Sequence, residues 1–182
     1  MHPSHVLVLP GWQSSGPAHW QSRWELLHGY QRVEQHDWMR PLRGDWSMRL
    51  EEAVLSLDAS EGPAVLVAHS LACHLVAAWA AHSRQAHRVK AALLVAPGDA
   101  EREELRARLP SWSPLVLERL PFKSLLIGSR NDPFCEAGRA RQFASAWGSD
   151  FVDLGEAGHI NADSGLGDWA WGHAQLQALL ND

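Results

Sequence analysis

The sequence has no excess of basic residues, no long apolar run and very little cysteine, and each absence removes a class of protein. Its 182 residues include 16 Lys and Arg against 21 Asp and Glu, a net charge of −5, which gives no electrostatic case for nucleic acid. No apolar stretch approaches the roughly 20 residues needed to cross a bilayer. Residues 1–10 lack a charged region ahead of an apolar core, so they predict a first strand rather than a signal peptide. We therefore expect neither a nucleic-acid nor a membrane partner.

Cysteine is limited to Cys73 and Cys135, which are not spaced as metal ligands or as a disulfide framework. This predicts a reduced, cytoplasmic protein in which Cys73 is a buried thiol. Histidine is more abundant, at 11 residues, but no set has the spacing typical of metal ligands. The histidines weighed as ligands are His19, His36, His69 and His159. We expect no metal and no cofactor.

Short apolar runs alternate with helical patterns along the whole chain. The runs expected to form strands are 5–9, 33–38, 65–68, 91–96, 123–128 and 151–154, the more polar second run lying nearer an edge. The expected helices lie between Pro17 and Gly29, from an N-cap at Asp45 through Leu57, from Leu71 through Trp79, and over 101–109, 136–147 and 166–180. Strict alternation predicts one α/β domain over residues 1–182. Its six-stranded, mostly parallel sheet would have helices on both faces.

One junction in this pattern predicts chemistry, because the apolar run before Ser70 passes directly into a helix of small residues. Ala68 and Ala72 stand two positions before and after the serine. Small residues there let strand and helix approach while the serine takes a strained conformation, the arrangement of a nucleophile elbow. The alternative is a serine that simply caps an ordinary helix.

Later strand exits carry the partners that an activated serine needs. Asp132 follows the fifth strand and His159 the sixth, which gives the chain order Ser…Asp…His. His159 is the predicted general base, and Asp132 would orient its imidazole. Asp99, after the fourth strand, is the alternative acid, and Asp163 is a third candidate.

Loops around Ser70 are expected to supply an oxyanion hole and a pocket. The backbone N–H groups of Trp12 and Leu71 are the predicted oxyanion donors. Ten tryptophans against one tyrosine suggest aromatic pocket walls, which would favour small or medium apolar groups over charged ones. The predicted pocket residues are Gly11, Trp12, His69, Trp38 and Trp112. The tryptophans expected in the core are Trp20, Trp24, Trp79 and Trp147.

Several short motifs together resemble one family. They are Leu9-Pro10-Gly11-Trp12, His19-Trp20-Gln21 with Trp24-Glu25, Gln35-His36-Asp37-Trp38, His69-Ser70-Leu71, Ser129-Arg130-Asn131-Asp132-Pro133 and Gly158-His159-Ile160-Asn161. In these the chain resembles the small serine hydrolases grouped around retinoblastoma-binding protein 9 and the bacterial YdeN proteins.

The resemblance implies a minimal α/β-hydrolase fold without a large cap domain and the triad Ser70, Asp132 and His159. It also implies hydrolysis of small esters or aminoacyl-type amides. Two features depart from the family. Alanines replace the elbow glycines, and residues 71–75 lack the glutamate of a Leu-x-Cys-x-Glu segment, so retinoblastoma-type binding is not expected.

The function that these observations favour is a cofactor-free serine hydrolase that acts through an acyl-enzyme on a small ester or amide. Two alternatives remain open at this point. One is a hydrolase-shaped binding module with a weak or inactive site, and the other is a cofactor-free dehalogenase or lyase.

Overall fold

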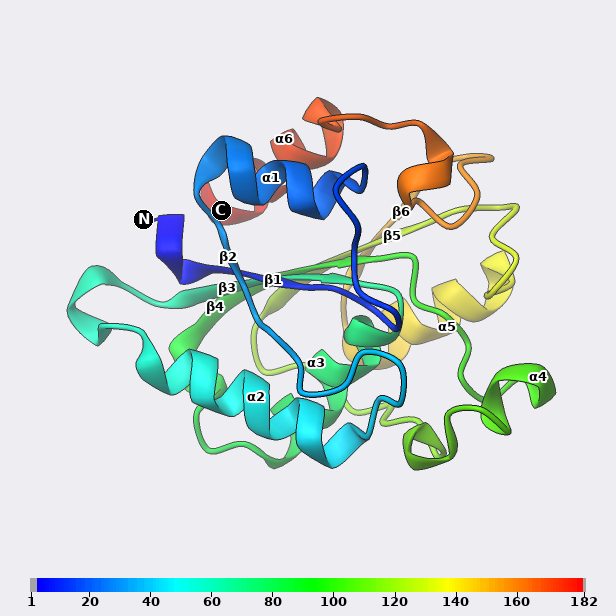
Figure 1. The fold of residues 1–182 in the computed structure, drawn as a ribbon, viewed down its shortest axis with the longest axis horizontal. Helices are drawn as coiled ribbons and strands as arrows, with labels where there is room; N and C mark the ends of the chain where they lie inside the picture. Colours follow the sequence, from blue (N-terminus) through cyan, green and yellow to red (C-terminus); the bar gives the residue numbers. More distant parts are fainter. Residues whose placement is uncertain (1–2, 182) are drawn as a thin grey trace.

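A six-stranded parallel sheet, with strand order β2-β1-β3-β4-β5-β6, organises the computed structural model, which describes residues 3–181 (Figure 1). The strands are β1 (Val6–Leu9), β2 (Gln31–Arg32), β3 (Ala64–His69), β4 (Val89–Val95), β5 (Lys123–Gly128) and β6 (Asp150–Asp153). The helices are α1 (Trp20–His28), α2 (Arg43–Ser56), α3 (Leu71–His82), α4 (Glu103–Arg106), α5 (Ala137–Trp147) and α6 (Ala170–Asn181). Single 3-10 turns lie at Pro3–His5, Ala59–Glu61, Ala86–Arg88, Pro110–Trp112 and Ala162–Ser164. All five strand pairings are parallel, as the alternating pattern predicts.

Helices cover both faces of the sheet because its central strands are apolar on both sides. In β3, Leu66 and Ala68 pack into the core formed with α2, α3 and α5. Val65 and Val67 face the opposite way, into the core formed with α1 and α6. Figure 1 shows these two helical layers above and below the sheet. The predicted fold class, with helices on both faces, is therefore confirmed.

The second strand is much shorter than predicted, although its edge position is right. It spans Gln31–Arg32 instead of 33–38, and the Val33 N–H adds one further bond, of 2.9 Å, to the Val8 carbonyl. Beyond Val33 the chain leaves the sheet. Asp37 Oδ1 accepts the N–H groups of the residues two and three positions later, at 2.8 and 2.9 Å. This turn, together with the packing of the Trp38 ring against Trp46 of α2, takes the chain away from the sheet.

The ends of several helices differ from those that their patterns predict. Helix α2 starts earlier than predicted, at Arg43, so Asp45 lies in its first turn and is not its N-cap. Helix α6 starts at Ala170 instead of 166, because Gly165, Gly167 and Trp169 have positive φ angles of 65°, 57° and 43°, which a right-handed helix does not contain. Helix α4 covers only four residues of the expected 101–109. Of the residues that follow it in this segment, Leu109 is buried in the core, whereas Ala107 and Arg108 are exposed.

Residues 99–121, which connect β4 to β5, pack along the side of the molecule formed by α2. The indole of Trp112 is fully buried, donates to the Pro41 carbonyl at 2.9 Å and meets the ring of Trp46 in α2 edge-on at 5.6 Å. Leu109 is also buried in this core. The segment is thus held to α2 and does not form a large cap. The loops that follow β1, β3, β5 and β6 gather at the carboxyl edge of the sheet, toward the right in Figure 1.

Candidate active site

Ser70 occupies a sharp turn between β3 and α3. Its backbone angles are φ 57° and ψ −124°, a conformation that costs about 1–3 kcal/mol outside a supporting structure. The Ser70 N–H donates to the Val95 carbonyl of β4 at 2.9 Å, which fixes the turn to the sheet. Ala68 and Ala72 are both completely buried on either side of it. Although Ser70 stands at the N-cap position of α3, its side chain makes no cap hydrogen bond, so the hydroxyl is available for another partner.

The side chains of Ser70, His159 and Asp132 form a continuous hydrogen-bonded chain. His159 Nε2 lies 2.9 Å from Ser70 Oγ, and His159 Nδ1 lies 2.9 and 2.8 Å from the two carboxylate oxygens of Asp132. A carboxylate only accepts hydrogen bonds, so Nδ1 carries the proton and Nε2 presents its lone pair to the serine hydroxyl. The Asp132 side chain is only 3% exposed, which keeps water from competing for the imidazole.

The two other acids considered for this role lie elsewhere. Asp99 is paired with Arg139, at 3.3 Å between Oδ2 and Nε, and its Oδ1 accepts the Glu101 N–H. Asp163 is exposed in the turn that follows His159. Of the three candidates, the structure brings only Asp132 to the imidazole.

Hydrogen bonds from several parts of the chain hold the loop that carries His159. Asn131 Oδ1 accepts the Gly158 N–H at 2.7 Å, and the His69 ring donates from Nε2 to the His159 carbonyl at 2.9 Å. The indole N–H of Trp20, in α1, donates to the Ile160 carbonyl at 2.8 Å. These contacts come from the loop after β5, from β3 and from α1. They bind the backbone of His159 and of the residues directly before and after it, which fixes the position of the imidazole.

The loop after β1 lies directly against the elbow because Gly11 has no side chain. A Cβ at this position would lie 2.8 Å from the Cβ of Ser70 and 2.9 Å from the His69 carbonyl oxygen. The backbone N–H groups of Trp12 and Leu71 have no hydrogen-bond acceptor within residues 3–181. Two free N–H groups next to a serine hydroxyl are what a developing oxyanion requires.

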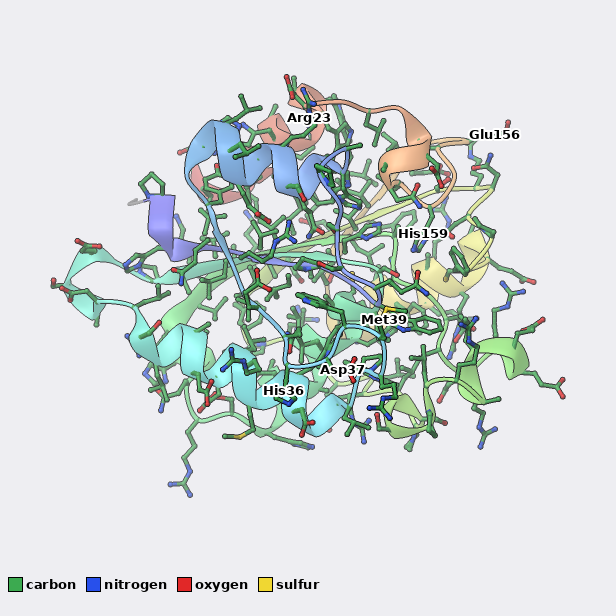
Figure 2. All side chains as sticks on the ribbon, viewed as in Figure 1. Arg23, His36, Asp37, Met39, Glu156 and His159 are labelled. Atoms are coloured by element: carbon green, nitrogen blue, oxygen red, sulfur yellow. The ribbon has the colours of Figure 1, made fainter. Side chains whose placement is uncertain are left out.

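A second loop braces the β1 exit from outside. The Trp12 indole donates to the Met39 carbonyl at 3.1 Å, and the Gln13 N–H donates to the Trp38 carbonyl at 3.0 Å. Figure 2 shows Asp37 and Met39 near the N-terminal end of α2. The motif around His36 and Asp37, predicted as a strand, is thus the support of the Gly11–Trp12 turn.

A cavity of about 400 Å³ opens above Ser70. It is lined by Gly11, Trp12, Gln13, Ser14, Gly16, His19, His69, Ser70, Leu71, Gly98, Ala100, Leu105, Arg108, Leu109, Phe134, His159, Asn161 and Ala162. Three of the five predicted pocket residues, Gly11, Trp12 and His69, therefore line it.

The other two predicted pocket residues, Trp38 and Trp112, do not line the cavity. Both pack edge-on against the ring of Trp46, at centroid distances of 5.5 and 5.6 Å. Trp112 falls on the α2 side of the molecule because segment 99–121 turns toward α2, where the indole is fully buried. Trp38 lies there because the chain leaves the sheet after Val33 and turns toward α2, whose Trp46 donates to the Asp37 carbonyl at 3.3 Å. Phe134, after β5, supplies aromatic surface instead and meets the His159 ring edge-on at 4.7 Å.

Three histidine rings follow one another at the cavity: His19 lies 4.7 Å from His69, which lies 4.9 Å from His159. Burial, and after it the neighbouring His159 and His19, holds the pKa of His69 well below its ordinary value. Burial likewise lowers the pKa of His19 to about 4, aided by His159 and Arg32. Both rings are therefore neutral at neutral pH.

The fourth histidine weighed as a ligand, His36, lies beside α2 and away from His159 (Figure 2). Within residues 3–181, no group of three or more His, Cys, Asp or Glu side chains is arranged to hold a metal ion.

Sequence reasoning missed the positioning role of Gln21. Its side-chain amide donates to the Leu9 and Val67 carbonyls, each at 3.1 Å, and its oxygen accepts the Ser15 hydroxyl at 2.8 Å. It thereby ties the end of β1 to the neighbouring β3. The available signal was the place of Gln21 in the motif His19-Trp20-Gln21, directly after a tryptophan expected in the core.

A family model described as serine hydrolase matches residues 6–178. The chain belongs to the serine hydrolase family. The resemblance to YdeN-type hydrolases stated from the sequence motifs is thereby confirmed.

Solved structures agree with this assignment. A YdeN-like hydrolase from Pectobacterium atrosepticum is 32% identical, with a TM-score of 0.78, over 96% of this chain and 89% of the other. The ydeN product of B. subtilis shares the fold at 17% identity and a TM-score of 0.78, over 97% and 98% of the two chains. Est1E from Butyrivibrio proteoclasticus shares it at 13% identity and a TM-score of 0.72, over 94% and 88%.

A comparison with curated protein sequences gave no match. None of the helices formed by residues 3–181 combines the length and the apolar character needed to cross a bilayer.

Proposed function

We propose that the protein hydrolyses small esters or amides through an acyl-enzyme, with Ser70 as nucleophile, His159 as general base and Asp132 as the acid that orients it. The observation that carries this proposal is the unbroken Asp132–His159–Ser70 hydrogen-bonded chain at the floor of a cavity. Membership of the serine hydrolase family supports it independently.

The geometry suits each step of acyl transfer. His159 Nε2 takes the Ser70 proton as Oγ attacks the substrate carbonyl, and the imidazolium that forms is stabilised by Asp132. Collapse of the tetrahedral intermediate breaks the bond to the leaving alcohol or amine, which receives that proton from His159. A water molecule then attacks the acyl-enzyme by the same route and releases the acid and the free serine.

The backbone N–H groups of Trp12 and Leu71 are the proposed oxyanion donors. They flank the serine because Gly11 allows the β1 exit to touch the elbow. One such donor contributes roughly 100- to 1,000-fold in rate in serine hydrolases. Side-chain substitutions at either position leave the N–H in place and therefore test this role poorly.

The two cysteines support neither a competing thiol nucleophile nor an extracellular disulfide. Both are free thiols. Burial raises the pKa of Cys73 above its ordinary range, and burial together with Asp132 and Asp99 raises that of Cys135 to about 12. A buried thiol with a raised pKa is a poor nucleophile. Free thiols agree with a cytoplasmic location, which remains part of the proposal.

Steady-state hydrolysis of a 4-nitrophenyl ester by matched acid variants tests the assignment. Asp132→Asn should lower kcat roughly 1,000- to 10,000-fold, because the amide favours the wrong imidazole tautomer. Asp99→Asn, which breaks only the pair with Arg139, should leave most of the activity. Loss of activity in Asp99→Asn with retention in Asp132→Asn would reverse the assignment.

A further inference from the structure

Arg108 is a guanidinium at the cavity whose charge is not neutralised by an acidic side chain of the protein. It belongs to the segment after α4, lines the cavity and stacks on the ring of Trp12, with Cζ 4.4 Å from the ring centroid. No carboxylate among residues 3–181 lies in ion-pair contact with it. The Trp12 indole is itself held by its bond to Met39, so the stacking surface is fixed.

Three of the four acidic residues that precede Arg108 in the segment bind other arginines, and the fourth, the exposed Glu103, makes no ion pair within residues 3–181. Asp99 and Glu101 both pair with Arg139, at 3.3 and 2.7 Å, and Glu104 pairs with Arg102 at 3.7 Å. The charge on Arg108 is therefore left for another partner.

The rest of the cavity lining contains no negative charge that would offset the charge of Arg108. No Asp or Glu lines the cavity, and Arg108 is its only Lys or Arg side chain. The catalytic-site carboxylate, Asp132, is not part of the lining and is bound to His159. The lowered pKa values of His19 and His69 keep these two rings uncharged. A substrate in the cavity thus meets one full positive charge and no full negative one.

Stacking on an indole leaves the edge of a guanidinium free. The planar group attaches to the ring through its face, while its N–H donors point outward in the plane, where a carboxylate can bind through two oxygens. Arg108 is exposed at the cavity, and its contact with the indole restricts the rotamers of its side chain, so less entropy is lost when an anion binds.

We propose that Arg108 binds a carboxylate on the substrate, so that the enzyme prefers esters or amides that carry a negative charge a few bonds from the scissile carbonyl. The inference rests on the proposed function, and it adds a charged group to the small apolar acyl groups expected from aromatic walls. Leu105, Leu109 and Phe134 still provide apolar surface for the chain between the two polar ends.

Two sets of esters test the preference, one with the charge in the acyl group and one with it in the leaving group. The first compares the 4-nitrophenyl monoester of adipic acid with the neutral heptanoate and the cationic 6-aminohexanoate. The second compares 4-acetoxybenzoate with the neutral 4-acetoxybenzamide. The measured quantity is the ratio of kcat/KM for the anionic ester to that for its neutral partner.

Arg108→Gln should lower this ratio in at least one set by about ten- to hundredfold, the range expected when a charged hydrogen bond is lost. Arg108→Glu should shift the preference toward the 6-aminohexanoate. The matched control is Arg106→Gln, which removes the same charge from an exposed α4 position outside the cavity lining and should leave both ratios unchanged.

The inference is overturned if Arg108→Gln changes neither ratio, or if Arg106→Gln changes them equally. If the wild-type protein still hydrolyses the neutral esters, either of these results leaves the proposed function intact. If the wild-type protein hydrolyses no ester of either set, the proposed function itself fails.

Discussion

Gly11 packs so closely against the turn of Ser70 that a single methyl group has no room. We expect Gly11→Ala to lower kcat by at least tenfold, since a Cβ 2.8 Å from the Ser70 Cβ must push the β1 exit away and displace the Trp12 N–H. Ester hydrolysis by the folded variant, checked by circular dichroism, measures this effect.

The matched control is Gly138→Ala in α5, where an added Cβ meets nothing within 4 Å. This change should leave hydrolysis intact and raise the free energy of unfolding by at most about 0.5–1 kcal/mol, because alanine loses less backbone entropy than glycine in the first turn of a helix. Equal activity in both variants would contradict the tight contact at Gly11.

At the residue level, the sequence predicted the groups that depend on chain order and missed those that depend on packing. Ser70, Asp132 and His159 each follow a strand, and parallel strands end at one edge, so their meeting was predictable. Trp112 lies in an irregular segment whose direction is decided by packing against α2. Arg108 lies in the same segment, and no local pattern distinguishes it from the surface arginines around it.

Helix α1 links the core to the loop of His159 through two indole N–H groups. Trp20 donates to the Ile160 carbonyl at 2.8 Å and Trp24 to the Asp168 carbonyl at 2.7 Å. Trp20→Phe keeps most of the apolar surface but removes the donor, so a buried carbonyl loses its partner. We expect a loss of about 1–3 kcal/mol in unfolding free energy and a several-fold lower kcat.

Trp79→Phe separates these two effects. Its indole donates at 2.6 Å to Glu51, in α2, and the bond lies outside the cavity lining. The variant should lose comparable stability in urea unfolding while its kcat stays near the wild-type value. If both variants lose kcat alike, Trp20 acts through general stability and not through the His159 loop.

Among the elements, those with continuous apolar runs were predicted best. The strands β3, β4 and β5 and helix α5 match their expected ranges within about two residues, because both faces of these strands and one face of the helix are buried. The misplaced strand 33–38 has a polar pattern, and the Asp37 turn that replaces it uses side-chain hydrogen bonds. Hydrophobic periodicity carries no information about such bonds.

For the molecule as a whole, three buried histidines should make stability depend on pH. Burial is the main reason that the pKa values of His19 and His74 fall to about 4 and that of His69 falls well below its ordinary value. Between pH 6.5 and 4 these groups bind protons in the unfolded chain but not in the folded one. Their contribution is therefore fully present above pH 6.5 and is lost as the pH falls toward 4, by about 1.4 kcal/mol per pH unit for each group.

Urea unfolding at pH 7.0, 6.0 and 5.0 measures this slope. His74→Gln can still donate toward the Gly98 carbonyl, which His74 contacts at 2.6 Å, and should reduce the slope by about one histidine's share. The exposed His36 provides the control, since His36→Gln should leave the slope unchanged. A stability that does not change over this range would show that the buried rings take up protons in place.

The fold class was predictable from the sequence because it depends on the order of strands and helices along the whole chain. Strand and helix alternate six times, which leaves a parallel sheet with right-handed crossovers as the expected arrangement. The strand order could not be read from the alternation itself. It depends on which faces of the helices are apolar, and the sheet runs from β2 through β1 to β3 because α1 covers one face while α2 and α3 cover the other.

Covalent labelling with a fluorophosphonate probe tests the central claim most directly, because the probe reacts only with a serine that a neighbouring base has activated. The wild-type protein should be labelled, and peptide mapping should place the label on Ser70. Ser70→Ala should fold normally, by circular dichroism, and take no label. A folded Ser70→Ala that is still labelled, or a wild-type protein labelled at another residue, would contradict the account.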